Sequence, residues 1–262
     1  MSMTYRGTTA LITGASAGLG VEFARQWAER GADVVLVARR VDRLEELAAD
    51  LERRHGVKAR PIAADLAAPG AAAALHAELD TLGIPVHTLI NNAGFGSHGP
   101  FAAQEPAQIS EMIQLNVAAV ADLTRQFLPA LVADGRGALV NIASSAAYQP
   151  TPSMAVYGAT KAFVLNFTEA VAYETRASSL RVLAVSPGPV RTEFFDVVGT
   201  PDAAVGRMAT PAEVVTATRR ALERATTPPS IVVGLGNRFS ATASTLAPRR
   251  LALTVAGHAL KA

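Results

Sequence analysis

The sequence predicts an α/β fold in which one doubly wound parallel sheet carries helices on both faces, giving three α/β/α layers. Short apolar runs of strand length alternate along the chain with longer segments of helical spacing. This alternation favours parallel strands joined by right-handed crossovers. Half of the 262 residues are apolar and 18% are charged, which is enough for a sizeable core. No linker rich in Pro, Gly or Ser divides the chain, so we expect a single domain over residues 1–262.

The bounds of the individual elements follow from these runs and from the turn-forming residues between them. Gly31 provides a C-cap for the first helix, and Pro106 is well tolerated in the first turn of the fourth. The expected strands are Thr8–Thr13, Asp33–Ala38, Lys58–Ala63, Val86–Ile90, Gly137–Ala143, Leu180–Val185 and Ile231–Val233. The expected helices are Gly18–Arg30, Val41–His55, Ala71–Leu82, Pro106–Ala133, Ala155–Arg176 and Pro211–Ala225.

Composition excludes several classes of function. The 24 Lys and Arg residues barely outnumber the 22 Asp and Glu residues, so no nucleic-acid partner is expected. The chain has no cysteine, which excludes disulfides, thiolate metal sites and cysteine nucleophiles, and no metal site is expected. The N-terminus has no apolar segment of signal-peptide length, and no charge-free apolar stretch is long enough to span a bilayer. We therefore expect a cytoplasmic protein.

A glycine-rich loop, Thr13–Gly20, joins the first strand to the first helix. Glycines let the backbone turn sharply, and the helix N-terminus offers free N–H groups to a phosphate. The spacing is G-x-x-x-G-x-G rather than the usual G-x-G-x-x-G of dinucleotide-binding folds, and a tight connection is the alternative reading. The strand before it and the helix after it favour a pyrophosphate site. The expected cofactor contacts here are Gly14, Ser16, Gly18, Leu19 and Gly20.

The end of the second strand, Ala38-Arg39-Arg40, indicates which dinucleotide binds. In a dinucleotide fold an acidic residue here bonds the ribose 2′-hydroxyl, whereas arginine suits a 2′-phosphate. Neither Ala38 nor Arg39 is acidic, so NADP(H) is favoured over NAD(H), with Arg39 as the main contact and Ser16 as a weaker one. The alternative is a solvated basic helix start.

Tyr157 and Lys161 lie four residues apart at the start of a long apolar helix and therefore share a face. A free tyrosine ionises near pH ~10, and a fixed cation nearby favours the phenolate and lowers the tyrosine pKa. The pair is thus a candidate general acid or base, although this spacing also occurs by chance on many helices.

Several further short motifs occur along the chain after the glycine loop. They are Asp65, Asn91-Asn92-Ala93-Gly94, Asn116, Ser144, Tyr157-x3-Lys161, Pro187-Gly188 and Thr192, after Thr13-Gly14-x3-Gly18-x-Gly20. In this order they resemble the short-chain dehydrogenase/reductase family, in its small single-domain branch, over roughly Tyr5 to Ile231. The resemblance implies a Rossmann-type fold and NAD(P)-dependent hydride transfer between a carbonyl and an alcohol.

The resemblance also implies individual roles. Tyr157 donates its proton to the carbonyl oxygen, and Lys161 lowers the Tyr157 pKa and binds the nicotinamide ribose. The family places its serine thirteen residues before the tyrosine, which selects Ser144 to stabilise the oxygen and leaves Ser145 for the substrate wall. Asn116 helps to hold a water behind Lys161, or alternatively makes a kink or polar contact within its helix. The remaining implied cofactor contacts are Asp65, Asn92, Ala93, Gly94, Pro187, Gly188, Val190 and Thr192, with Tyr157 and Lys161.

The connection Arg191–Thr210 is long enough to act as a lid over the substrate. Its phenylalanines, with apolar residues from other loops, predict a pocket for a hydrophobic ketone, aldehyde or secondary alcohol; ordinary core packing is the alternative. The expected wall consists of Phe95, Ser145, Met154, Phe194 and Phe195.

Two features suggest further contacts. The helices at 106–133 and 155–176 are apolar on most sides, so a second subunit is expected to cover them in a homodimer or homotetramer. The tail Phe239–Ala262 is expected to form an amphipathic helix that packs over the pocket or at a subunit interface. Contact with a membrane surface is the less favoured alternative.

The leading hypothesis is therefore an NADP(H)-dependent carbonyl reductase or alcohol dehydrogenase. A cofactor-binding regulatory or scaffold protein would be expected to lose the tyrosine, lysine or serine, and all three remain. A non-redox epimerase or dehydratase is the third possibility, but that branch usually carries a larger substrate domain.

Overall fold

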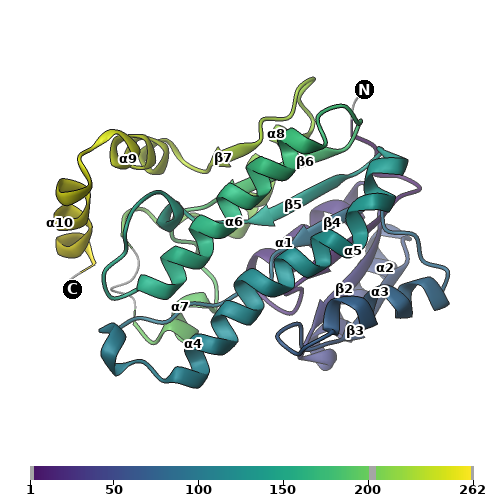
Figure 1. The fold of residues 1–262 in the computed structure, drawn as a ribbon. Helices are drawn as coiled ribbons and strands as arrows, with labels where there is room; N and C mark the ends of the chain where they lie inside the picture. Colours follow the sequence, from purple (N-terminus) through teal and green to yellow (C-terminus); the bar gives the residue numbers. More distant parts are fainter. Residues whose placement is uncertain (1–2, 201–204, 261–262) are drawn as a thin grey trace.

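The computed structural model describes residues 3–200 and 205–260, so parts of the expected lid (201–204) and tail (261–262) lie outside the described residues. Its centre is a seven-stranded parallel sheet in the order β3-β2-β1-β4-β5-β6-β7 (Figure 1). The strands are β1 Thr9–Thr13, β2 Asp33–Ala38, β3 Ala59–Ala63, β4 Thr88–Asn91, β5 Ala138–Ile142, β6 Arg181–Ser186 and β7 Ser230–Val232. The predicted α/β fold with a Rossmann-type doubly wound sheet is confirmed.

The strand order reverses between β1 and β4. Leu11 of β1 pairs with Val35 of β2 on one side and with Leu89 of β4 on the other. The chain therefore winds outward in both directions from β1. Ligands in open α/β sheets bind at such a switch point, beyond the carboxyl ends of the strands.

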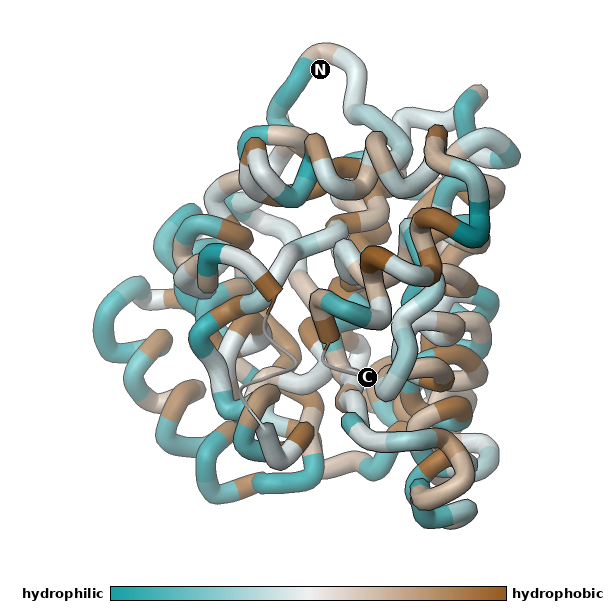
Figure 2. The backbone as a smooth tube through the Cα atoms, turned by 90° about the vertical axis from the view of Figure 1, so that its left-hand side faces the viewer, coloured by the Kyte–Doolittle hydropathy of each residue, from teal (hydrophilic) through white to brown (hydrophobic). Residues whose placement is uncertain are grey.

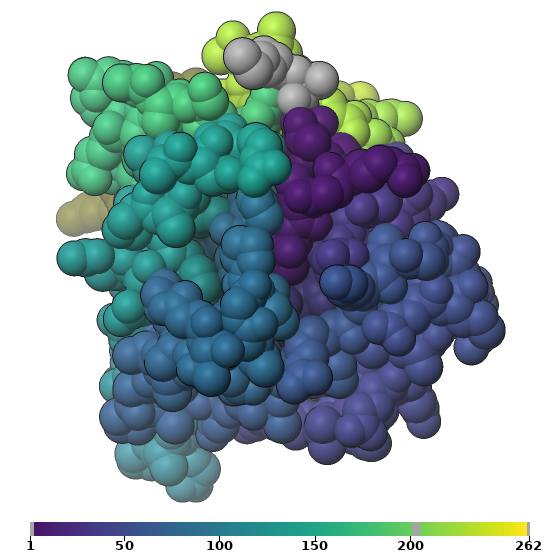
Figure 3. Space-filling model, turned by 90° about the vertical axis from the view of Figure 1, so that its right-hand side faces the viewer, coloured from purple at the N-terminus to yellow at the C-terminus, as the bar shows by residue number. Residues whose placement is uncertain are grey.

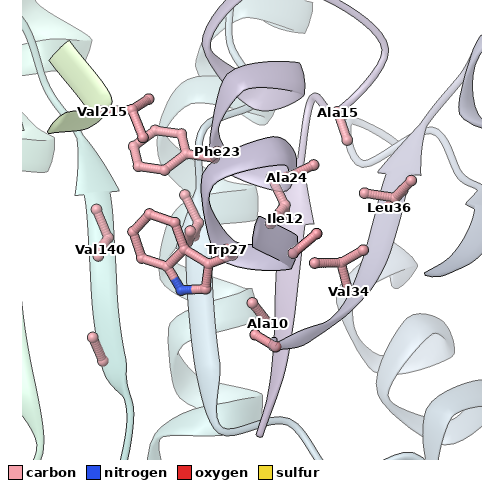
Figure 4. Close-up of a cluster of buried hydrophobic side chains, with 14 of the residues drawn as sticks. Ala10, Ile12, Ala15, Phe23, Ala24, Trp27, Val34, Leu36, Val140 and Val215 are labelled. Carbon is pink, nitrogen blue, oxygen red and sulfur yellow. The ribbon is translucent and has the colours of Figure 1, made fainter. Parts of the chain in front are cut away.

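Alternate residues of β1 point to opposite faces of the sheet and meet different helices. Ile12 packs with Phe23 and Trp27 of helix α1, as Figure 4 shows. Its neighbour Leu11 lies in a second cluster that includes Leu123 of helix α5. Helices α1, α2 and α8 contribute to the first cluster, and α3, α5 and α6 to the second.

Helices occupy both faces of the sheet (Figure 1), and Figure 3 shows the N-terminal part of the chain, in purple and blue, beside the teal middle. Among the described residues, none of the helices combines the length and apolarity needed to cross a bilayer. The helices are α1 Gly18–Glu29, α2 Val41–His55, α3 Ala71–Thr81, α4 Pro106–Ile113, α5 Ala119–Asp134, α6 Ala155–Glu174, α7 Phe194–Val198, α8 Pro211–Leu222, α9 Leu235–Leu246 and α10 Arg249–Ala259, with short turns η1 Phe101–Ala103, η2 Gln114–Ala118 and η3 Ser145–Tyr148.

The expected helix Pro106–Ala133 is not continuous. The π-helical turn η2 separates α4 from α5, and Asn116 lies fully buried within it. A π turn inserts extra backbone into a helix and often marks a functional position. The periodicity of the sequence continues through the turn, which is why it predicts one helix.

The tail also departs from the expectation, because it forms two helices rather than one. Helix α9 begins at Leu235, before the expected start at Phe239, and α10 follows a break at Ala247-Pro248. Proline lacks an N–H group and disfavours helical geometry in the residue before it. Ala247 is accordingly extended, with φ −70° and ψ 148°.

Candidate active site

The glycine loop is shaped by contacts that only glycine permits. Gly14 and Gly18 have φ values of +66° and +55°, in the left-handed region. A Cβ atom on Gly20 would lie 2.2 Å from the Gly14 carbonyl oxygen. The N-terminus of α1 has no side-chain cap, so its backbone N–H groups remain available to an anion. Gly20 itself does not line the cavity described below; it allows the tight turn that shapes the loop.

The segment Asn92–Gly94 after β4 is fixed against the glycine loop. The Thr13 Oγ1 atom accepts hydrogen bonds from the backbone N–H groups of Asn92 and Ala93, both at 2.9 Å. The Asn92 side-chain Nδ2 donates to the Thr13 carbonyl at 2.8 Å. These bonds make the ends of β1 and β4 one rigid surface.

Asn116 connects this surface to helix α6. Its Oδ1 accepts from the Phe95 backbone N–H at 3.1 Å, and its Nδ2 donates to the Phe95 carbonyl at 2.9 Å and to the Thr160 hydroxyl at 3.1 Å. Asn116 does not line the cavity. Its side chain therefore makes the polar contact that was the alternative reading, and the water-holding role stays a prediction.

Ser144, Tyr157 and Lys161 come together where β5 ends and α6 begins. We call this group the Ser–Tyr–Lys wall. Ser144 caps the turn η3 through a 3.1 Å hydrogen bond from the Ala146 N–H. The Lys161 Nζ donates to the Ile142 carbonyl at 2.7 Å and lies 5.9 Å from the centroid of the Tyr157 ring.

Burial dominates the ionisation of this wall. It raises the pKa of Tyr157 to about 12, against which a hydrogen bond with Ser144 acts to lower it. Burial also lowers the pKa of Lys161 to about 8. The net pKa of Tyr157 therefore lies above its ordinary value, because removal of water from the phenol outweighs any lowering by the cation, which is held toward Ile142. The stabilisation of the phenolate by Lys161 stays a prediction.

An exposed cluster of charges is formed by Arg39, Arg40, Arg43 and Glu193, and we call it the basic rim. Arg40 bonds the Ser16 hydroxyl at 3.1 Å and the Glu193 carboxylate at 2.9 Å. Arg43 reaches the same carboxylate at 2.6 Å, and Arg43 and Arg40 together hold the Glu193 pKa below its usual range. Arg39 pairs with Glu111 at 3.0 Å.

The sequence prediction named only Arg39 and Ser16 at this rim and missed Arg40. The structure brings Arg40, rather than Arg39, to the Ser16 hydroxyl. The second arginine of Ala38-Arg39-Arg40 was the available signal, whereas nothing in the sequence pointed to Glu193, which lies more than 150 positions away.

The remaining predicted cofactor residues lie along the same edge of the sheet. The methyl group of Thr192 is so close to Gly18 that an added Cβ would lie 2.8 Å from it. A Cβ on Gly188 would lie 2.3 Å from the Asn237 amide of α9. The Asp65 carboxylate accepts from the Ala67 N–H at 3.1 Å. The start of the lid and the start of the tail thus both contact the cofactor edge.

One cavity of about 670 Å³ is lined by every predicted site residue except Gly20 and Asn116. Its apolar end has Tyr157 and Phe194 with ring centroids 5.4 Å apart, and Phe195 beside Phe194 at the same distance. Leu260, the last described residue, packs here with Met154 and Val198. The tail thus reaches the cavity through Leu260, which was not among the predicted wall residues.

Comparisons with known proteins identify the family of this chain. A family model described as short chain dehydrogenase matches residues 8–202. A short chain dehydrogenase from Pseudocercospora fijiensis is 33% identical over 76% of this chain, and the match spans 64% of that protein's length.

Two solved structures are similar over almost the whole chain. A short-chain dehydrogenase from Sphingobium yanoikuyae in complex with NADPH is 35% identical, with a TM-score of 0.80 and 95% of each chain covered. A structure from work on 7β-hydroxysteroid dehydrogenase stereoselectivity is 28% identical, with a TM-score of 0.85, 98% of this chain and all of that chain covered.

Proposed function

The chain belongs to the short-chain dehydrogenase family of oxidoreductases, and from that premise we propose that it interconverts a carbonyl and an alcohol on a hydrophobic small molecule with NADP(H). One observation carries the proposal. The Ser–Tyr–Lys wall and the glycine loop border the same cavity, and the part of that cavity next to Tyr157 is apolar. A proton donor, a dinucleotide cradle and a hydrophobic pocket therefore meet at one place.

The residues of this cavity fit a nicotinamide dinucleotide. Gly14 and Gly18 let the loop approach Asn92 and Thr192 more closely than a residue with a side chain could, and the uncapped N-terminus of α1 offers its N–H groups to a phosphate. We expect Lys161 and the Asn92–Gly94 segment, which line the same cavity, to hold the nicotinamide ribose. When bound, the nicotinamide supplies or accepts the hydride.

The basic rim supports NADP(H) over NAD(H). Arg40 and the Ser16 hydroxyl, with Arg39 beside them, offer charged and neutral donors to a 2′-phosphate. Arg40 and Arg43 already hold the Glu193 carboxylate, which supports the proposal that the rim binds a phosphate.

In the reducing direction Tyr157 donates its phenolic proton to the carbonyl oxygen of the substrate. A pKa of about 12 keeps this proton in place at neutral pH until the oxygen becomes basic. Ser144 donates a hydrogen bond to the same oxygen as negative charge develops on it. Lys161, largely protonated at neutral pH, stabilises the phenolate that remains.

The apolar end of the cavity favours a bulky hydrophobic substrate. The space next to Tyr157 is surrounded by apolar side chains from three segments. They are Phe194 and Phe195 of the lid, Leu260 of the tail, and Met154 at the start of α6. The similar structure studied for 7β-hydroxysteroid dehydrogenase stereoselectivity is named for a substrate of this kind. We take apolar ketones and secondary alcohols as the substrate class.

We further propose a cytoplasmic homodimer or homotetramer. A shallow apolar groove between η2 and α6 is lined by Phe101, Ile113, Val117 and Val156, and Phe101 is 60% exposed. Large apolar groups at such a surface favour cover by a second subunit. Gel filtration with light scattering at micromolar concentration should give a multiple of the monomer mass, and the monomer mass would refute this proposal.

The direct test of function is coenzyme consumption with a panel of ketones and aldehydes of increasing apolar size. We expect NADPH to be oxidised faster than NADH, with the highest kcat/KM for bulky apolar ketones. Tight NADPH binding without oxidation by any member of the panel would instead support a regulatory or non-redox role.

A further inference from the structure

Helices α9 and α10 use their hydrophobic residues in an unusual way. The side chains that they bury are small: Ala241 in α9, and Ala252 and Ala256 in α10. Their large apolar side chains are exposed instead. The exposed fractions are Leu235 87%, Phe239 78%, Leu246 80%, Leu251 56%, Leu253 48% and Val255 60%. The exposed apolar groups therefore do not serve the core of this chain.

These exposed residues are spaced to share helix faces. Leu235, Phe239 and Leu246 fall at positions i, i+4 and i+11 of α9. Leu251 and Val255 fall at i and i+4 of α10. The two helices form one end of the molecule in Figure 1, and Figure 2 views that end directly. We call these five side chains, with the arginines described next, the tail surface.

Three arginines accompany the apolar residues. Arg238, Arg249 and Arg250 are exposed, and no ion pair among the described residues involves any of them. The sequence contains no Asp or Glu after Glu223. All 22 acidic residues thus lie in the preceding part of the chain, and the tail surface carries positive charge without compensation.

We propose that the tail surface docks on an anionic lipid membrane. Aromatic and aliphatic side chains beside arginines are what interfacial helices present to the headgroup and acyl boundary. A second copy of this chain fits less well. A two-fold contact pairs the same patch with itself and brings arginines together with no carboxylate nearby.

The tail surface is attached to the active site through its inner side. Ser244 of α9 donates to the Gln149 side chain at 2.6 Å, and Leu260 packs with Met154 and Val198 at the cavity. The docked membrane lies next to the helices that close the apolar end of the cavity. Hydrophobic substrate dissolved in the lipid then has a short path to the site.

The test is sedimentation of the full-length protein with phosphatidylcholine vesicles in which roughly a third of the lipid is phosphatidylglycerol. The wild type is expected to sediment with these vesicles at low salt and to dissociate from them at high salt. It should not sediment with vesicles of pure phosphatidylcholine. Replacing Arg238, Arg249 and Arg250 by Gln should lower the partition coefficient on the order of a hundredfold.

Matched variants distinguish a loss of positive charge from the tail surface from the same loss elsewhere on the protein. Replacement of the exposed arginines Arg25, Arg60 and Arg220 by Gln removes the same charge elsewhere and should leave sedimentation unchanged. The variant with Leu235, Phe239 and Leu246 replaced by Ser should lose vesicle binding, while NADPH binding and the melting temperature report that it is folded.

Three results would overturn the proposal. The wild type could stay in the supernatant at low salt, or both arginine triple variants could bind equally. In the third case, the wild type would be a dimer in the absence of vesicles and the apolar variant would be a monomer. That outcome would assign the tail surface to contact with a second copy of the chain.

Discussion

The Ser–Tyr–Lys wall and the basic rim border the same cavity, but the polar groups of the wall are buried and those of the rim are exposed. In the wall, Lys161 is only 6% exposed, and burial shifts the pKa values of Tyr157 and Lys161 away from their ordinary range. At the rim, the side chains of Arg39 and Arg40 are 64% and 43% exposed and hold partners from distant segments.

This difference has a physical consequence. Buried polar groups are costly to rearrange because a lost partner is not replaced by water. Exposed ion pairs contribute little to stability and exchange partners at low cost. The wall is therefore suited to fixed proton chemistry, and the rim to releasing one anion and accepting another.

Ser144→Ala should produce the largest effect among the predictions that separate the two regions. Loss of the donor to the developing oxyanion is expected to lower kcat by about 10²–10³. The NADPH dissociation constant should stay within about twofold, since Ser144 is remote from the rim. Ser145→Ala is the matched control and should change mainly KM. Equal losses of kcat in the two variants would contradict the assignment of Ser144.

Arg40→Ala should change the coenzyme preference rather than the chemical step. Loss of a charged donor to the 2′-phosphate is expected to weaken NADPH binding by about 10- to 100-fold and to leave NADH binding nearly unchanged. Fluorescence titration with both coenzymes measures the effect. Arg39→Ala, whose side chain is more exposed and does not reach Ser16, should have a smaller effect in the same direction. If neither variant changes the ratio of NADPH affinity to NADH affinity, the basic rim does not bind the 2′-phosphate.

The pH dependence reports the wall. Lys161 has a lowered pKa of about 8, so it is charged below that pH and loses its proton as the pH rises through it. Tyr157, with a raised pKa of about 12, stays protonated over this range. The kcat/KM for NADPH at saturating ketone should therefore be flat below pH 8 and fall by up to about tenfold per pH unit above it. A rise of kcat/KM between pH 8 and 10 would contradict this assignment.

Glu193→Gln should give the smallest effect, and in the opposite direction. Its carboxylate competes for Arg40 and Arg43, so its removal is expected to tighten NADPH binding by about two- to fivefold. NADH binding should not change. Asp196→Asn, three residues further along the lid and without an arginine partner among the described residues, is the control. Weaker NADPH binding by Glu193→Gln would show that the carboxylate helps the cofactor instead of competing with it.

The sequence could predict those features that depend on local patterns of residues. The glycine loop, Ser144 and the Tyr157–Lys161 pair are local patterns, tied to strand ends and helix spacing, and the fold follows from alternation. Ser144, Tyr157, Lys161 and most of the glycine loop line one cavity, so the structure brings these residues together.

What the sequence missed depends on contacts between distant segments. Glu193 meets Arg40 only because the lid folds back over the start of α2. Leu260 reaches Met154 because the tail breaks into two helices. The direction of the Tyr157 pKa shift depends on how much protein surrounds the phenol, which residue spacing does not contain.

The account depends most on proton donation by Tyr157, and single-turnover oxidation of bound NADPH by the best apolar ketone tests that claim most directly. Tyr157→Phe should slow the single turnover by about 10²–10⁴ and bind NADPH as tightly as the wild type. Tyr148→Phe, which removes a hydroxyl that contacts Ser186 at 3.4 Å near the same cavity, should turn over at the normal rate. A Tyr157→Phe protein that oxidises NADPH at the wild-type rate would show that another group supplies the proton.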